Sequence, residues 1–170
     1  MIRSLLTLAA VAALSGNVIA AGDHASGHGH GDHAGGHGHG DHHGKSTAGT
    51  PGDPAKVKRT IKITMDDTMR FSPSTISAKR GETLRLQVSN VGKVAHELVI
   101  GPKEELMAHA ELMRKFPGME HDEPNMIRLE PGASGDIVWQ FDQDGSVDFA
   151  CLIPGHMEAG MVGTVKVGKK

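Results

Sequence analysis

Apolar and polar side chains alternate with a period of two along several short stretches of the chain. Residues 60–65 (Thr-Ile-Lys-Ile-Thr-Met) and 83–88 (Thr-Leu-Arg-Leu-Gln-Val) are the clearest examples, and this period is typical of a strand with one buried face. Four more strand-like stretches occur at 94–100, 137–141, 147–151 and 163–167. Gly, Pro and Asn residues mark turns between them, so the pattern predicts an all-β protein built as an antiparallel β-sandwich.

One segment departs from this pattern. Residues 103–116 are rich in helix-forming residues and contain no β-branched side chain. Pro102 suits the first turn of a helix, and Pro117-Gly118 would end it. We therefore expect a short helical insertion at residues 102–126 within the sandwich.

The first 20 residues have the pattern of a signal peptide (1–20). Arg3 supplies a positive charge, residues 5–14 form an apolar core, and Val18-Ile19-Ala20 precede an expected cleavage after Ala20. The apolar run is too short to span a bilayer, as is every other apolar run in the sequence. The sequence thus predicts export to a bacterial periplasm and no membrane span.

Residues 21–55 are predicted to form a disordered tract followed by a linker. A nine-residue repeat that begins Gly-Asp-His starts at Gly22 and at Gly31, and a third copy starts at Gly40. The tract has almost no apolar residue whose burial could offset the conformational entropy of ordering. It contains eight of the chain's 12 histidines: His24, His28, His30, His33, His37, His39, His42 and His43. The globular domain is therefore expected at residues 56–170.

Composition narrows the range of partners. Removal of Arg3 with the signal peptide leaves 17 basic and 20 acidic residues, a net charge of −3, whereas nucleic-acid binding requires a basic surface. The chain has no Tyr and few other aromatic residues, which argues against a surface that stacks sugars or bases. A single cysteine cannot form an internal disulfide. In an oxidising compartment Cys151 must therefore be buried, paired with another chain or held by a metal.

Cys151 begins a Cys-x4-His-x4-Met pattern that places Cys151, His156 and Met161 on one loop between two predicted strands. A second imidazole, His96, lies in the strand-like stretch 94–100. A thiolate, two imidazoles and a distant thioether are the ligands of a mononuclear blue-copper site. Taken singly, a Cys or a Met is more often a core residue, and zinc would gain little from the thioether. The joint pattern favours copper.

The residues from Val57 onward resemble the cupredoxins, the family of plastocyanin, azurin, rusticyanin and auracyanin. Residues 69–73 and 76–82 look like the first strands of small cupredoxins. The loop has Pro154-Gly155 before its His and Gly160 before its Met, and its spacing is similar to that of rusticyanin and auracyanin. The resemblance implies a cupredoxin-like Greek-key sandwich.

By position, the resemblance implies that His96, Cys151 and His156 are equatorial copper ligands and that Met161 is the axial ligand. Copper, as Cu(II) or Cu(I) at one type 1 site, is the expected cofactor. In plastocyanin and azurin, an Asn that follows the upstream His ties the two ligand segments together; here that residue is Glu97. Contacts around the ligands tune metal affinity and potential, so the substitution leaves the redox potential open.

Further His and Met residues indicate additional, weaker copper ions, because imidazoles suit Cu(II) and thioethers suit Cu(I). His109 and Met113 are four residues apart on the predicted helix and share a face, with Glu105 one turn earlier. The candidates in the insertion are Met107, His109, Met113, Met119, His121 and Met126, in addition to the eight histidines of the tract. The alternative is that these methionines fill the core, Met107 included, and that the tract is a solvated spacer.

The whole layout resembles the periplasmic copper-tolerance cupredoxins of the CopI type, which combine a His-rich N-terminal region with a Met- and His-containing insertion. This resemblance implies copper tolerance through binding, buffering or redox handling of copper. The alternative is a soluble periplasmic electron-transfer cupredoxin. The expected partners are copper ions and a periplasmic redox or copper-handling protein, and we expect a monomer.

An enzyme is not expected. A multicopper oxidase needs further His-x-His pairs, and in this chain such pairs occur in the repeats, at 28–30 and 37–39. A copper nitrite reductase needs a second cupredoxin domain, and the chain has room for one.

Overall fold

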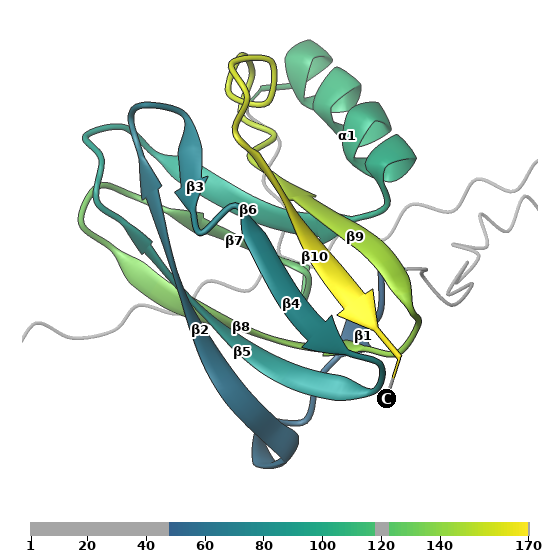
Figure 1. Cartoon of the computed structure of the whole chain (residues 1–170). Helices are drawn as coiled ribbons and strands as arrows, with labels where there is room; N and C mark the ends of the chain where they lie inside the picture. Colours follow the sequence, from purple (N-terminus) through teal and green to yellow (C-terminus); the bar gives the residue numbers. More distant parts are fainter. Residues whose placement is uncertain (1–47, 118–122, 170) are drawn as a thin grey trace, which may run out of the picture. The chain divides into compact units, whose positions relative to one another are not determined.

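Two five-stranded sheets pack face to face (Figure 1) in residues 48–117 and 123–169, the part of the chain that the computed structural model describes. In order across the first sheet, the strands are β1 (Thr50–Pro51), β8 (Ser134–Phe141), β5 (Glu82–Asn90), β2 (Val57–Asp66) and β3 (Arg70–Ser72). In the second sheet they are β4 (Thr75–Lys79), β10 (Val162–Gly168), β9 (Gly145–Ala150), β6 (His96–Gly101) and β7 (Met126–Leu129). The predicted signal peptide and the His-rich tract up to residue 47 lie outside the described residues.

The predicted sandwich is confirmed, but two of its strand pairs are parallel. β2 runs parallel to β5, and β4 runs parallel to β10, whereas the remaining pairs are antiparallel. After β2 the chain turns into β3, crosses to the second sheet as β4 and returns to the first sheet as β5. A parallel pair needs such a crossover. Alternation reports which face of a strand is buried and not its direction, so the expected antiparallel pairing was wrong for these two pairs.

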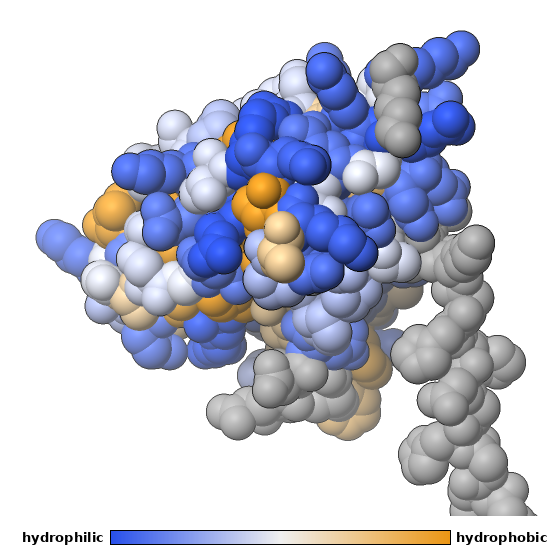
Figure 2. Space-filling model, turned by 90° about the horizontal axis from the view of Figure 1, so that it is seen from below, coloured by the Kyte–Doolittle hydropathy of each residue, from blue (hydrophilic) through white to orange (hydrophobic). Residues whose placement is uncertain are grey.

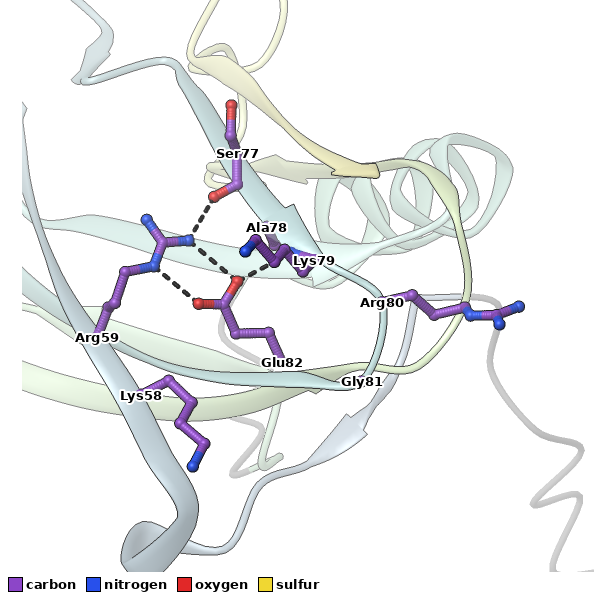
Figure 3. A pocket seen from close by; sticks show the side chains of 8 residues that line it. All are labelled: Lys58, Arg59, Ser77, Ala78, Lys79, Arg80, Gly81 and Glu82. Atoms are coloured by element: carbon purple, nitrogen blue, oxygen red, sulfur yellow. Dashed lines mark hydrogen bonds and ion pairs between the residues drawn. The ribbon is translucent and has the colours of Figure 1, made fainter. Parts of the chain in front are cut away.

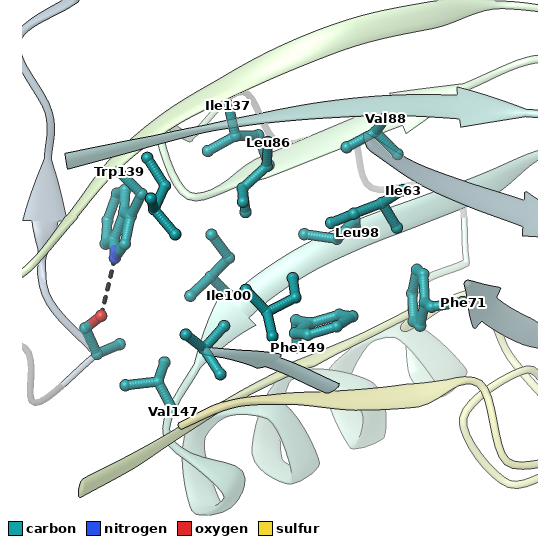
Figure 4. Packing of buried hydrophobic residues seen from close by; sticks show 14 of the residues in the cluster. Ile63, Phe71, Leu86, Val88, Leu98, Ile100, Ile137, Trp139, Val147 and Phe149 are labelled. Carbon is teal, nitrogen blue, oxygen red and sulfur yellow. Dashed lines mark hydrogen bonds between the residues drawn. The ribbon is translucent and has the colours of Figure 1, made fainter. Parts of the chain in front are cut away.

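The core lies between the two sheets, as Figure 4 shows. In β5, Leu84, Leu86 and Val88 are fully buried, in agreement with the alternation. Phe149 of β9 meets Phe71 of β3 edge to face, with ring centroids 5.0 Å apart. Burial of one such side chain stabilises the fold by about 1.5–3 kcal/mol. The packed core thereby fixes the strand ends from which the candidate metal-binding residues project.

Residues 48–51, before β2, are part of the sandwich, which corrects the linker predicted towards the end of residues 21–55. β1 pairs with β8, and the indole Nε1 of Trp139 donates a 2.8 Å hydrogen bond to the carbonyl oxygen of buried Ala48. The dashed line in Figure 4 marks this bond. Composition missed the strand because its stabilising partner is 91 residues away in the sequence.

The predicted helix forms as α1 (Lys103–Lys115), directly after β6, and lies beside β9 (Figure 1). Its buried residues, Leu106, Ala110 and Met113, have the spacing of one helix face. Met107 is 54% exposed, so the core-filling alternative does not hold for this side chain, and its role as an accessory copper ligand stays a prediction. Within residues 48–117 and 123–169, no helix combines the length and the apolar character needed to cross a bilayer.

Candidate metal centre

Three side chains that can ligate a metal converge at one end of the sandwich. His96, Cys151 and His156 each offer one ligand atom, and these atoms all lie within 4.8 Å of one another. His96 opens β6, Cys151 directly follows the neighbouring strand β9, and His156 lies on the loop to β10. Nδ1 of His156 is 3.3 Å from Nδ1 of His96 and 3.3 Å from Sγ of Cys151. The fold thus brings together the three residues that the sequence proposed as equatorial ligands.

The three groups differ in exposure. His96 and Cys151 are fully buried, and His156 is half-buried. Burial raises the pKa of the Cys151 thiol to about 12, against hydrogen bonds from the backbone that lower it. Burial, and after it the neighbouring His96, lowers the pKa of His156. At neutral pH the cluster therefore offers a neutral imidazole at His156 and a protonated thiol, whose proton must leave when a metal binds.

Met161 is tied to this cluster through its backbone. The N–H of Cys151 donates to the carbonyl oxygen of Met161 at 3.1 Å, and the N–H of Met161 donates to the carbonyl oxygen of His156 at 3.0 Å. Gly155 and Gly160 have φ angles of 90° and 99°, which glycine adopts without strain. The Met161 side chain is fully buried and belongs to the hydrophobic core, and its role as a ligand stays a prediction.

Glu97 joins the two segments that carry the cluster. Its carboxylate accepts a 2.9 Å hydrogen bond from the backbone N–H of Leu152, and its own backbone N–H donates to Sγ of Cys151 at 3.4 Å. The side chain is 3% exposed. Glu97 therefore links β6 to the start of the loop, a point that the sequence left open.

Asp67 is a site residue that sequence reasoning missed. It lies in the turn between β2 and β3, and its Oδ1 is 3.3 Å from Nε2 of His96. The backbone N–H of Lys93 donates to both carboxylate oxygens, at 2.9 and 2.8 Å. Hydrogen bonding from Lys93 is the main cause that lowers the pKa of Asp67. Nothing in the local sequence signals this role, because Asp67 and His96 meet only in the folded sandwich.

Two arginines hold the outer part of the loop. Nη1 of Arg70, from β3, donates a 2.8 Å hydrogen bond to the carbonyl oxygen of Ala159. Nη1 of Arg114, from α1, donates to Oε1 of Glu158 at 2.7 Å. Met157 packs against the small apolar cluster beneath α1. The loop is therefore held from the side of β3 and from the side of the helical insertion.

The structure does not add the accessory Met and His candidates to the three-residue cluster. Met113 is buried, and Met126 packs against the apolar cluster beneath α1, as the core-filling alternative predicts. Met107 of α1 is 54% exposed, and His109 is partly exposed. Met119, His121 and the eight tract histidines lie outside the described residues.

A pocket at the other end of β2 and β5 has a different character (Figure 3). Its charged lining residues are Lys58, Arg59, Lys79, Arg80 and Glu82. Arg59 donates to the carboxylate of Glu82 and to the carbonyl oxygen of Ser77, each at 2.8 Å. The lining contains no His, Cys or Met, so this pocket offers none of the nitrogen or sulfur ligands that copper prefers. The face shown in Figure 2 is mainly hydrophilic, with scattered hydrophobic side chains.

Comparison with protein families gives a match over the domain. A family model described as copper binding proteins of the plastocyanin/azurin family matches residues 56–168. The copper-resistant cuproprotein CopI of Rubrivivax gelatinosus is 49% identical over 164 residues, which cover 96% of this chain and 94% of the relative. A copper-resistant cuproprotein CopI of Vibrio cholerae is 34% identical over 125 residues, which cover 73% of this chain and 74% of that protein.

Solved structures support the fold. Auracyanin B superposes with a TM-score of 0.57 and 23% identity, covering 72% of this chain and 96% of auracyanin B. Dithionite-reduced auracyanin from Roseiflexus castenholzii gives a TM-score of 0.55 and 24% identity, covering 66% of this chain and 98% of that structure.

Proposed function

The chain belongs to the plastocyanin/azurin family of copper-binding proteins and, within it, to the CopI cuproproteins, and we propose that it is a periplasmic copper-resistance protein with one type 1 copper site. The observation that carries the proposal is the convergence of His96, Cys151 and His156, whose ligand atoms lie within 4.8 Å of one another. These three side chains are the proposed equatorial ligands. The thioether of Met161 is the proposed axial ligand.

The donor set fits copper better than zinc. One thiolate and two imidazoles that lie close together, with the thioether of Met161 on the same loop, match the preferences of a blue-copper site. A structural zinc site is usually completed by a fourth nitrogen, sulfur or oxygen ligand. Among the described residues, the cluster consists of His96, Cys151 and His156, and no Asp, Glu or further His or Cys completes it as a fourth ligand.

We propose that the surrounding residues fix the positions of the ligands and exclude water from His96 and Cys151. His96 and Cys151 are fully buried, whereas His156 is half-buried, so exchange of copper or of an electron is expected on the His156 side. When bound, copper supplies one-electron chemistry between Cu(II) and Cu(I). Cys151 gives up its proton on binding, and the protein itself catalyses no reaction in this proposal.

An electron-transfer cupredoxin of the periplasm is the second candidate, because a half-buried ligand is suited to electron exchange. Copper resistance is favoured by the two CopI relatives, whose names state that role. It is also favoured by the additional His and Met residues, among which Met107 is 54% exposed on α1. We propose that these residues bind further copper weakly. The signal-peptide pattern of residues 1–20 supports the proposed location.

A copper titration of the mature protein tests the proposal, followed by visible absorption and EPR. We expect a strong thiolate-to-Cu(II) band that saturates at one copper and is lost in Cys151→Ala. A variant lacking residues 22–44 should keep this band and bind less additional copper. Absence of the band from the wild-type protein would refute the type 1 site.

A deletion strain tests physiology. Complementation with the wild-type gene should restore growth on copper, and complementation with Cys151→Ala should not. Equal copper tolerance with and without the gene would favour the electron carrier. In that case the titration should also stop at one copper with or without residues 22–44.

A further inference from the structure

A carboxylate lies against the far side of one proposed ligand. Oδ1 of Asp67 is 3.3 Å from Nε2 of His96, while Nδ1 of the same ring is 3.3 Å from Nδ1 of His156. An imidazole has two nitrogens, and here one faces the carboxylate and the other faces the cluster. If Nε2 carries the proton and donates it to Asp67, Nδ1 presents its lone pair to the cluster.

The position of Asp67 is itself fixed by the loop between β5 and β6. The N–H groups of Lys93 and Val94 donate to the carboxylate, the latter at 3.3 Å. Nδ2 of buried Asn90 donates to the carbonyl oxygen of Val94 at 2.8 Å and holds this loop in place. A Cβ atom on Gly92 would clash with Oδ1 of Asp67. The carboxylate can therefore take its observed position because residue 92 has no side chain.

We propose that Asp67 is a positioning residue that holds the His96 ring with Nδ1 towards the copper and that its negative charge favours Cu(II) over Cu(I). This inference rests on the proposed function. Hydrogen bonding of a ligating histidine to a carboxylate fixes the ring and raises its basicity, and such outer partners commonly change metal affinity by about 10- to 100-fold. A nearby negative charge stabilises the more highly charged ion. The Asp67 side chain is 38% exposed, so solvent reduces this effect and we expect the lower end of the range.

This arrangement bears on the role of the protein. A site biased towards Cu(II) retains the oxidised ion more firmly than the reduced ion. That bias suits a protein that captures copper in an oxidising compartment better than it suits a high-potential electron acceptor.

Asp67→Asn is the decisive variant, because it removes the charge and keeps a side chain of the same shape. The matched control is Asp66→Asn, since the neighbouring Asp66 carboxylate accepts from the backbone N–H of Thr68 at 2.9 Å instead of facing His96. In Asp67→Asn we expect the ratio of Cu(II) to Cu(I) affinity to fall about tenfold, which equals a rise of about 59 mV in a one-electron potential. The thiolate band should remain. Equal potentials in the two variants would overturn the charge effect.

Gly92→Ala separates the effect of the position of the Asp67 carboxylate from the effect of its charge. It keeps the carboxylate but pushes it away from His96, so it should alter the EPR hyperfine coupling and raise the potential by less than Asp67→Asn. An unchanged EPR spectrum would contradict the positioning role.

The tautomer of His96 tests the positioning role without copper. In nitrogen-15 NMR of the apo-protein, His96 should carry its proton on Nε2 in the wild type and in Asp66→Asn. It should lose this preference in Asp67→Ala, which removes the acceptor oxygen that faces Nε2. A proton on Nδ1 in the wild type would overturn the inference. Failure of the wild-type protein to form the thiolate band would refute the proposed function, and the tautomer would still decide the role of Asp67.

Discussion

The carboxylate of Glu97 accepts a 2.9 Å hydrogen bond from the backbone N–H of Leu152, and both residues are buried. The same residue donates its backbone N–H to Sγ of Cys151 at 3.4 Å. Glu97 directly follows His96 in β6, and Leu152 directly follows Cys151. The two contacts thus set the spacing between the strand that carries one proposed ligand and the loop that carries the others.

Replacement of Glu97 by Ala should destabilise the apo-protein. It leaves the buried N–H of Leu152 without its acceptor, which costs about 1–3 kcal/mol. Glu97→Gln keeps an acceptor oxygen and should lose less than half as much. Denaturant unfolding of the apo-protein measures both, with exposed Glu130→Ala as the control, expected to be near neutral. Equal losses in the Ala and Gln variants would contradict the role assigned to this hydrogen bond.

Copper binding should release one proton from Cys151. Burial raises the pKa of this thiol to about 12, so the apo-protein carries the thiol form well above neutral pH. His156, with a lowered pKa, is already neutral at pH 8 and contributes none. Below the thiol pKa, the apparent affinity for Cu(II) should therefore rise about tenfold per pH unit above pH 8.

Titration in weakly buffered solution at pH 8 measures this proton. The wild-type protein should release about one proton per copper bound at the coloured site, and Cys151→Ala should release none there. Ultraviolet absorption of the thiolate in the apo-protein should likewise be absent at pH 8. Thiolate absorption at that pH would show that the thiol is not held neutral by burial.

The Arg59–Glu82 pair should make stability depend on acid pH. The hydrogen bond from Arg59 is the main cause that lowers the pKa of Glu82 in the folded protein. A carboxyl whose pKa is lower folded than unfolded stabilises the protein above its unfolded pKa, and this contribution is lost as pH falls through the folded pKa. Glu82→Gln should therefore cost about 1 kcal/mol at pH 7, since Arg59 is partly exposed, and almost nothing near pH 2.

Unfolding of wild type and Glu82→Gln between pH 2 and pH 7 checks this expectation. Asp144→Asn is the control, because Asp144 is exposed and lies 3.8 Å from Arg80. The copper spectrum should not change in either variant, since the pair lies at the opposite end of β2 and β5 from the cluster. If the wild type were still more stable than Glu82→Gln by the same amount at pH 2, the charge of Glu82 would not be the cause of the difference in stability.

Removal of β1 should destabilise the domain. A chain that begins at residue 56 lacks the carbonyl oxygen of Ala48, which accepts from Trp139, and it uncovers one edge of β8. We expect a loss of about 2 kcal/mol relative to a chain that begins at residue 48, from one buried unpaired donor and lost apolar contact. Trp139 is the single tryptophan of the chain, so its fluorescence should shift to longer wavelength. In the longer chain, Trp139→Phe removes the indole donor and serves as the comparison.

The sequence by itself determined the features that depend on neighbouring residues. The alternation at 60–65 and 83–88 predicted β2 and β5, and the helix formers at 103–116 predicted α1. The Cys-x4-His-x4-Met spacing placed Cys151 and His156 within reach of each other on one loop. These signals are local because a strand or helix shows its buried face in its own periodicity.

Only the tertiary structure decided which distant segments meet. Asp67 and His96 are 29 positions apart, and Glu97 and Leu152 are 55 positions apart. No pattern in the intervening sequence predicts either contact. The same holds for β1, whose partner lies far along the chain, and for Met107, which the packing of α1 leaves exposed. Such contacts depend on strand order, on the two parallel pairings and on loop closure. A residue's local pattern reports whether it is buried, and the packing of the whole sandwich determines what it is buried against.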